Sequence, residues 1–389
     1  MNTPKGAWGR LLSPLLLVAF LGGCVSPVEQ QEKPEPFQFR SLRLRQNDPK
    51  GQPLWELQSP KARYKLNDRQ ALVQQPVGLL FRKGKPHYRI TAPRGVVYND
   101  GEQVELLGGA RLVSLDGRQL VITGRQAIWR PSKDTIDLLG APMAEDPSQR
   151  LTAGKARFHL KQELLELRQQ PLLRQWRRQQ SHRSLPSLEL LTSRADWYTQ
   201  TGLLKAAGPI RSVQRQKQQQ RSLTASGLEG NTREQWLDFL APVFLEDPAA
   251  KIQIQAGRSR WWIEAERVTS AEQAQGQIRK LHVSGSNLEL LDRQQIVSVG
   301  SDCFLRQPGE WLKADRCRWN WRSGALLAEG SVQLHRDKLQ QLTRAERLEG
   351  SSGPDGTVLF TAPGQRVETQ LRFAPGAGSP KPQGPPVQF

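Results

Sequence analysis

Apolar and polar residues alternate along most of the chain, and the alternation belongs to a repeated pattern. An aliphatic residue is followed by a small residue two places later, a second small residue three places on, and an aromatic residue two places after that. The copies are Leu57/Ser59/Ala62/Tyr64, Ile122/Gly124/Ala127/Trp129, Leu151/Ala153/Ala156/Phe158, Leu190/Thr192/Ala195/Trp197, Ile254/Ala256/Ser259/Trp261 and Leu312/Ala314/Cys317/Trp319, with looser ones at Ile90/Ala92/Gly95/Val97 and Leu223/Ala225. A period of two predicts strands with one buried face.

The copies recur about every 30 residues, a spacing typical of repeat architectures. The step from Ala256 to Ala314 spans about two repeats, so we expect a degenerate copy between them. Sixteen residues after the first small residue, several copies have a glycine, and where it is missing a proline stands one place later: Gly108, Gly140, Gly208, Gly330, Pro76 and Pro242. Glycine or proline at a fixed place in a strand predicts a bulge or corner. The fold class expected is therefore all-β, with two or three short strands and a bend in each repeat. The aromatic positions are expected to fill the same place in every unit.

The spacing of the copies predicts two β regions, at residues 37–176 and 185–372, with an arginine-rich stretch between them. This stretch is interpreted as the boundary between two halves of one continuous sheet structure, or as a long loop. In the second region, residues 264–277 are rich in Ala, Glu and Gln, and we expect a short helix there. Residues 373–389 are rich in Pro and Gly and are expected to be disordered.

The N-terminus predicts export. Residues 1–23 contain Lys5 and Arg10, an apolar run of about half the ~20 residues of a membrane span, and the sequence Leu-Gly-Gly before Cys24. This box resembles that of bacterial lipoproteins, which implies that Cys24 is acylated after cleavage and that residues 24–36 form a polar linker. The alternative is an ordinary signal peptide with an incidental cysteine. Either interpretation places the rest of the chain in the periplasm.

The chain is strongly basic, with a net charge of +19 and a calculated pI near 10.3. This charge favours an anionic cargo or a membrane surface. Nucleic acid would also suit it, but an exported protein is not expected to bind nucleic acid. The candidates for a cationic rim are Arg40, Arg43, Arg174, Arg177 and Arg178, whose alternative interpretation is solvated loop or strand faces.

No catalytic pattern is present in the sequence. The five histidines are scattered without zinc-site spacing, no Gly-x-Ser-x-Gly occurs, and the carboxylates form no cluster. We therefore expect no catalytic residue, no metal and no cofactor, and a protein that is not an enzyme. Cys303 and Cys317 are the cysteines besides Cys24, and an oxidising compartment allows them to form a disulfide. The alternative is two buried thiols.

The repeat, its Gly/Pro bends and the lipoprotein-type start resemble the periplasmic lipopolysaccharide-export proteins of the LptC/LptA/OstA-like family. Residues 37–176 resemble the membrane-anchored LptC, through 39–44, Trp55-Glu56-Leu57, Tyr64 and 104–106, and residues 185–372 continue the repeat as LptA does. LptC itself usually has a membrane helix in place of the lipobox and about half this length. The resemblance implies an elongated, twisted β-jellyroll with an apolar interior groove.

The resemblance also implies a function. The protein would be anchored at the inner rather than the outer membrane, receive lipopolysaccharide from the inner-membrane ABC transporter and pass it along the groove. Its end strands would pair with a periplasmic bridge protein or the outer-membrane translocon. The candidates for groove-lining residues are Ile90, Val104, Leu106, Ile122, Ile136, Leu138, Leu190, Ile254 and Leu312. The alternative function is a lipid-anchored β-solenoid that binds or cleaves envelope polysaccharide.

Overall fold

The computed structural model describes residues 37–371, except residues 178, 179, 181, 217, 218, 339, 352–357 and 365. The expected signal peptide, Cys24, the linker and the tail 373–389 therefore lie outside the described residues. The described chain forms 34 strands and two 3-10 turns, η1 (Asn99–Gly101) and η2 (Pro131–Lys133). The predicted all-β fold is confirmed. Among the described residues, none forms a helix with the length and apolar character that a membrane span requires.

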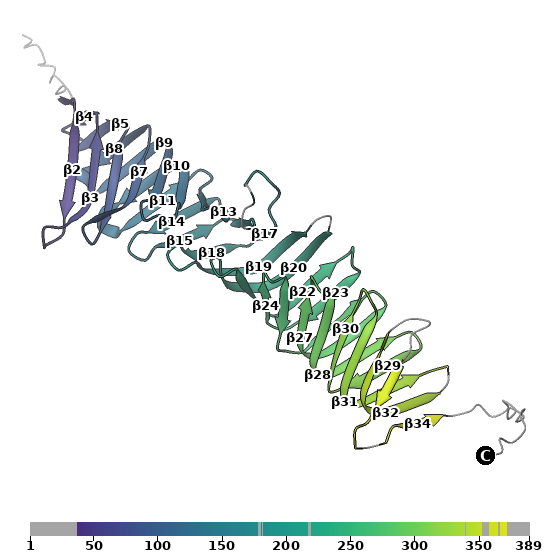
Figure 1. Cartoon of the computed structure of the whole chain (residues 1–389). Coiled ribbons are helices and arrows are strands. Elements are labelled where there is room, and N and C mark those ends of the chain that lie inside the picture. Colours follow the sequence, from purple (N-terminus) through teal and green to yellow (C-terminus); the bar gives the residue numbers. More distant parts are fainter. Residues whose placement is uncertain are drawn as a thin grey trace, which may run out of the picture. The chain divides into compact units, whose positions relative to one another are not determined.

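The strands are arranged in two layers, and in each layer strands pair antiparallel in chain order (Figure 1). Layer A contains β2 (Leu42–Asn47), β3 (Pro53–Ser59), β6 (Val77–Arg82), β7 (Lys85–Thr91), β12 (Met143–Glu145), β13 (Gln149–Thr152), β16 (Leu172–Gln175), β17 (Leu188–Leu191), β22 (Val243–Asp247), β23 (Ile252–Ala256), β26 (Ala274–Ile278), β29 (Glu310–Ala314) and β34 (Glu368–Leu371). Layer B contains β1 (Phe37–Phe39), β4 (Lys61–Lys65), β5 (Gln70–Gln74), β8 (Arg94–Tyr98), β11 (Thr135–Leu139), β14 (Lys155–His159), β15 (Leu164–Arg168), β18 (Arg194–Tyr198), β21 (Trp236–Leu240), β24 (Ser259–Trp262), β25 (Arg267–Ser270), β30 (Arg316–Asn320) and β33 (Val358–Thr361).

Four long hairpins belong to both layers. They are β9 (Gln103–Ser114) with β10 (Val121–Arg130), β19 (Leu203–Gln216) with β20 (Gln219–Asn231), β27 (Leu281–Leu291) with β28 (Ile296–Gln307), and β31 (Ala325–Arg336) with β32 (Gln341–Ser351). Each hairpin pairs with layer A at one end and layer B at the other, and its register shifts in between. These hairpins therefore connect the two layers both by continuous backbone and by hydrogen bonds between strands. Between residues 176 and 188, where the arginine-rich stretch interrupts the repeats, the pairs β15–β18 and β16–β17 continue both layers.

The small residue and the Gly/Pro position of each repeat mark the places where the chain changes layer. Ser59 is the last residue of β3, where the chain passes from layer A to β4 of layer B. Pro76 lies between β5 and β6, where it returns, and Gly140 plays the same part between β11 and β12. In β9 the return lies within one strand, at Gly108, between the part that pairs with β8 and the part that pairs with β7. The predicted corners are confirmed.

The expected degenerate repeat lies in β27, which pairs with β26 of layer A before Gly285 and with β25 of layer B after it. Gly285 is 29 residues from both Ala256 and Ala314. The helix expected at 264–277 is wrong, because these residues form β25, a corner and the start of β26. Period-two burial explains the difference: Ala274 and Ile278 are buried while Gln275 and Gln277 are exposed, and strand pairing overrides a weak local helix propensity.

Apolar side chains fill the space between the layers. One cluster of buried residues continues from Trp55 to Leu348. The aromatic residues of the repeats belong to it: Trp129 packs edge-on against Trp55 at 5.3 Å between ring centroids, and Phe158 packs against Tyr88 at 5.4 Å. These rings contribute packing between layers A and B, as edge-to-face pairs do in other protein cores.

A disulfide joins Cys303 in β28 to Cys317 in β30, with 5.9 Å between the Cα atoms. Cys303 lies in the part of β28 that pairs with β29 of layer A, whereas β30 belongs to layer B. The bond therefore ties the two layers at the corner between β29 and β30. Both cysteines are buried.

The bend at Gly285 generates a stability prediction. Its φ is +146°, and a Cβ there would lie 2.4 Å from Val299 Cγ1 and 2.6 Å from the carbonyl oxygen of Ser301. We expect Gly285→Ala to lower the free energy of unfolding by about 2–4 kcal/mol, measured by denaturant titration. Gly309→Ala is the matched control, because Gly309 also has a positive φ of +85° but nothing within 4 Å, and it should lose about 1 kcal/mol. An equal loss in both variants would show that close packing at the bend is unimportant.

Candidate functional site

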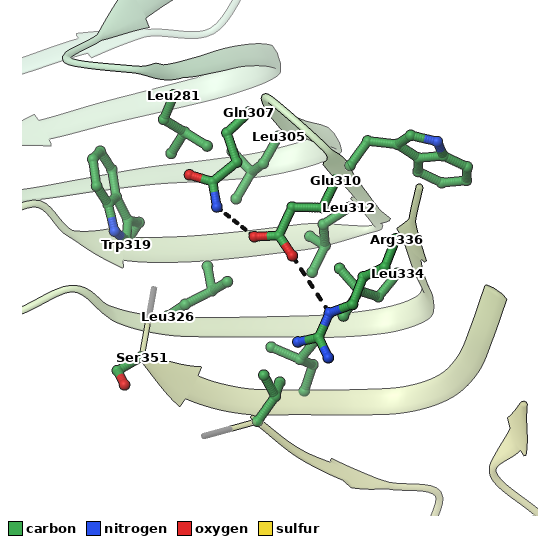
Figure 2. A pocket seen from close by; sticks show the side chains of 13 residues that line it. Leu281, Leu305, Gln307, Glu310, Leu312, Trp319, Leu326, Leu334, Arg336 and Ser351 are labelled. Atoms are coloured by element: carbon green, nitrogen blue, oxygen red, sulfur yellow. Dashed lines mark hydrogen bonds and ion pairs between the residues drawn. The ribbon is translucent and has the colours of Figure 1, made fainter. Parts of the chain in front are cut away.

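The interior holds a pocket of about 320 Å³ between the layers, near the C-terminal end of the described strands. Its volume is at the lower end of the ~300–1,000 Å³ that is usual for ligand sites. Figure 2 shows leucine side chains from several strands around it, with Trp319 on one side. The apolar wall of this interior pocket consists of Leu281, Leu305, Leu312, Trp319, Leu326, Leu334, Leu348 and Val358. Layer A and layer B both contribute to this wall, so the pocket is a space between them.

Polar side chains gather at one edge of the interior pocket. Glu310 lies 3.4 Å from Nε of Arg336 across the β29–β31 pair, and the amide of Gln307 also donates to Glu310 (Figure 2). Both carboxylate and guanidinium are partly exposed. The pocket is therefore amphipathic, with an apolar interior and a polar edge, which is the form that a lipid chain with a polar head requires.

The nine groove candidates all point into the interior, where each is at most 9% exposed. Leu312 lines the interior pocket. Ile254 also borders a shallow hollow of the outer face. The others pack within the buried cluster: Ile90, Val104, Leu106, Ile122, Ile136, Leu138 and Leu190. Over most of the two layers the predicted groove is thus occupied by the protein's own side chains.

The layers also meet along a seam, the side on which the hairpin turns of layer A face those of layer B. Glu163, in the turn between β14 and β15 of layer B, is 1% exposed and reaches layer A. Nη1 of Arg118 donates to it at 2.6 Å and Nη1 of Arg82 at 2.8 Å. The Tyr88 hydroxyl donates at 2.9 Å, and His87 is also a partner. Every oxygen of this buried carboxylate is satisfied, as a buried charge requires.

Hydrogen bonding decides the ionisation of Glu163. Burial by itself would raise the pKa of the carboxyl, but hydrogen bonds from His87, Arg118 and Tyr88 and the charge of Arg118 outweigh it, so the pKa lies below its ordinary value of 4.5. The same burial, together with the Glu163 carboxylate, raises the pKa of the Tyr88 hydroxyl. The cluster is therefore an ionised tie between the layers at neutral pH.

Further polar contacts cross the seam between later turns. Gln149 donates to Thr232 at 3.1 Å. Arg177 lies 2.7 Å from Glu266, and Arg221 of layer A lies 2.9 Å from Asp292 of layer B and 3.1 Å from Asp247. We call the Glu163 cluster and the contacts Gln149–Thr232, Arg177–Glu266 and Arg221–Asp292 the seam ties. Their layer B residues are Glu163, Thr232, Glu266 and Asp292.

The seam ties end before the interior pocket. Beyond Asp292, every ion pair between residues that the structure describes joins two residues of the same layer. The interior pocket lies in this part of the molecule, between β27 and β33. Among the described residues, the seam is thus tied by side chains where the interior is filled, and no ion pair crosses it where the interior pocket lies.

The cationic-rim candidates do not form one cluster. Arg43, Arg174 and Arg177 lie on or after different strands of layer A, and each pairs with a carboxylate: Glu56, Glu189 and Glu266 respectively. Arg40 is exposed between β1 and β2. Arg178 lies outside the described residues. Their role as a rim stays a prediction.

Sequence reasoning missed the seam ties. Glu163 and Arg118 lie 45 positions apart in turns of different repeats, and no local pattern connects them. One signal was present, because charged residues recur in the turns of both layers. Within the part of the chain that the structure describes, His, Cys, Asp and Glu side chains form no group of three or more that could hold a metal ion.

Comparisons with known proteins find a matching family model for the N-terminal part of the chain. Residues 15–172 match the family model described as LptC: Lipopolysaccharide-assembly, LptC-related. A search of curated proteins finds no match. Among solved structures, the chain is similar to LptH of Pseudomonas aeruginosa, described as the LptA homologous periplasmic component of the lipopolysaccharide transport device. That similarity has 13% identity and a TM-score of 0.26, and it covers 30% of this chain and 83% of LptH.

Glu163→Gln tests the largest seam tie. The variant leaves Arg82 and Arg118 facing a neutral amide, and we expect the free energy of unfolding to fall by about 2–3 kcal/mol in denaturant titration. Asp100→Asn is the control, because the Arg69–Asp100 pair is 62% and 60% exposed and such pairs contribute at most about 1 kcal/mol. A Glu163→Gln variant as stable as the wild type would mean that the tie is not stabilising.

The pH dependence of stability should differ between the same two proteins. Because the pKa of Glu163 is lower in the folded than in the unfolded state, its stabilisation is complete above the unfolded value near 4.5 and is lost as pH falls through the folded value. The difference in stability between wild type and Glu163→Gln should thus be constant from pH 6 to 8 and shrink below about pH 4.5, measured by unfolding at a series of pH values. A difference that grows on acidification would contradict the assignment.

Proposed function

We propose that this chain, whose residues 15–172 match the family model described as LptC: Lipopolysaccharide-assembly, LptC-related, is a periplasmic carrier that shields the acyl chains of lipopolysaccharide between its two layers. The observation that carries the proposal is the interior pocket, because it joins an apolar wall of leucines to a polar edge. Each buried CH₂ group of an acyl chain is stabilised by roughly 0.8 kcal/mol relative to water. The pocket holds a part of such a lipid rather than the whole.

Passage of acyl chains through the remaining interior requires the layers to separate. The corners at small residues, Gly and Pro are the hinges we propose, and the seam ties are the contacts that must break. In this model the lipid displaces side chains such as Ile122 and Leu138 from the filled interior. Near-equal apolar surroundings from repeat to repeat would let the chains advance without a deep trap. The energy for this movement comes from the inner-membrane ABC transporter.

The ends of the layers fit pairing with other proteins. At the N-terminal end β1 pairs with β4 and β2 with β3, and at the C-terminal end β33 and β34 both pair with β32, so each of the four leaves one edge unpaired among the described strands. Unpaired edges add strands from partners readily. We propose that a periplasmic bridge protein or the outer-membrane translocon pairs there, and that acylation of Cys24 holds the chain on the inner membrane.

The alternative of a polysaccharide-cleaving enzyme is not retained. The family model that residues 15–172 match is described by lipopolysaccharide assembly and not by a reaction. We therefore propose that the chain is a non-enzymatic component of lipopolysaccharide assembly.

Photo-crosslinking in cells tests the carrier proposal. A photoreactive residue at Leu312 or Leu326, which line the interior pocket, should form adducts with lipopolysaccharide that depend on ATP hydrolysis by the transporter. The controls are Leu327, the outward-facing neighbour of Leu326, and Arg318, the cross-strand partner of Leu327 on layer B, which should form few. The same photoreactive amino acid, placed at position 90 or 122 instead of Ile90 or Ile122, tests whether the lipid passes through the filled interior. Absence of adducts at Leu312 and Leu326, or equal yields at the control positions, would refute the carrier proposal.

A further inference from the structure

The outer face of layer A carries a hollow of about 710 Å³ on the same strands whose inner face forms the interior pocket. Its floor includes outward-facing side chains of β27, β28 and β29: His282, Phe304, Arg306, Trp311 and Lys313. We call these five residues, together with His335 of β31, which stacks on Trp311 beside the hollow, the outer platform. Period-two alternation explains the arrangement, because Leu305, Leu312 and Leu334 point inward from the same strands.

Aromatic rings lie side by side on the outer platform. Trp311 and His335 are paired across β29 and β31, and their rings stack at 5.4 Å with an angle of 12° between the planes. The Phe304 ring lies 6.4 Å from that of Trp311. Phe304, Trp311 and His335 face outward and are partly buried. Because these rings lie on the outer face of the strands, they do not pack in the interior between the layers. They are accessible to a ligand that binds in the hollow.

Basic side chains without carboxylate partners surround these rings. Arg306 is the cross-strand neighbour of Trp311, and Lys313 that of Phe304. The ammonium of Lys313 lies within 5.8 Å of both the Phe304 and Trp311 ring centroids. Neither Arg306 nor Lys313 forms an ion pair with another residue that the structure describes. Of the two carboxylates that line the hollow, Glu310 pairs with Arg336, and Asp337 lies 3.2 Å from Nδ1 of His335 on the outer platform itself.

A second aromatic cluster on layer B shows the contrast. Arg260 lies over the rings of Trp236 and Trp262, at 4.5 and 5.4 Å from their centroids. There Nε of Arg260 donates to Asp238 at 2.6 Å, so the charge is neutralised within the protein. The outer platform has a similar mixture of rings and cations but leaves its positive charge available, which is the complement of an anionic ligand.

The outer platform is also continuous with the interior pocket. Gln307, Glu310 and Trp311, at the turn between β28 and β29, border both. A molecule with an acyl chain in the pocket can therefore extend around this turn onto the outer face without leaving the protein surface.

We propose that the outer platform binds the anionic saccharide head of the lipid whose acyl chains enter the interior pocket. Pyranose rings present apolar C–H faces that pack on aromatic rings, as ligands of amphipathic aromatic sites do. Phosphate or sugar-acid groups on the same saccharide pair with Arg306 and Lys313. The inference rests on the proposed function for its cargo, but it names a separate surface with its own test.

Binding of a soluble saccharide to the whole chain tests the proposal. The probe is the phosphorylated oligosaccharide obtained by complete deacylation of lipopolysaccharide, titrated calorimetrically. Trp311→Ala and the double variant Arg306→Gln/Lys313→Gln should each weaken binding by about tenfold or more, and the affinity of the wild type should fall with added salt. Trp236→Ala on layer B is the control and should bind as the wild type does. Thermal unfolding of each variant verifies that it is folded.

The outcomes separate this inference from the proposed function. If the oligosaccharide does not bind, or binds Trp311→Ala and the double variant as tightly as the wild type, while lipid adducts persist at Leu312 and Leu326, the outer platform is not a head-group site and the carrier proposal stands. A dephosphorylated oligosaccharide that binds equally well would refute the role of Arg306 and Lys313. Vesicles of anionic phospholipid that displace the oligosaccharide would assign the surface to a membrane instead. Loss of the lipid adducts would refute the proposed function, whatever the oligosaccharide does.

Discussion

The structure depends on one constraint, the change of layer that each repeat makes while its strands stay paired. Backbone N–H and C=O groups must find partners through every bend, and a residue with a large side chain at the corner would collide with the neighbouring strand. At Gly208, for example, a Cβ would lie 1.9 Å from the carbonyl oxygen of Ser226. Small residues, Gly and Pro at fixed places therefore let two antiparallel layers form from a single ladder, with register shifts at the bends of the long hairpins.

The two sides of the molecule differ because of this construction. On the corner side, the layers are joined by continuous backbone, and near the interior pocket also by the Cys303–Cys317 disulfide. On the seam side, the contacts between described residues of the two layers are made by side chains, and these ties involve charged groups such as Glu163 and Arg221. Ion pairs of this kind are strong when dry and weaken when water enters. We therefore propose the seam as the side on which the layers part, as the proposed carriage of several acyl chains requires.

The inner and outer faces of the same strands provide two different chemistries at the C-terminal end. Leu305 and Leu312 form an apolar wall, and Phe304, Trp311 and Lys313 form an aromatic and cationic surface on the opposite face of the same strands. An amphiphile with acyl chains and an anionic head has the same division. The coincidence of both surfaces at one turn, 307–310, is the physical basis for treating them as parts of one binding region.

The sequence alone determined the all-β class, the repeat of about 30 residues, the corners and the inward direction of Ile90, Val104 and Leu312, because each follows from a period of two and from local backbone requirements of small residues, Gly and Pro. It misjudged 264–277, where the composition favoured a helix but pairing with β23 and β27 favoured strands. Only the tertiary structure decided which residues meet across the seam, that most of the interior is filled, and that a pocket remains between β27 and β33. Those features arise from contacts between residues of different repeats, such as Glu163 with Arg82, and a periodic pattern carries no information about which turn of one layer faces which turn of the other.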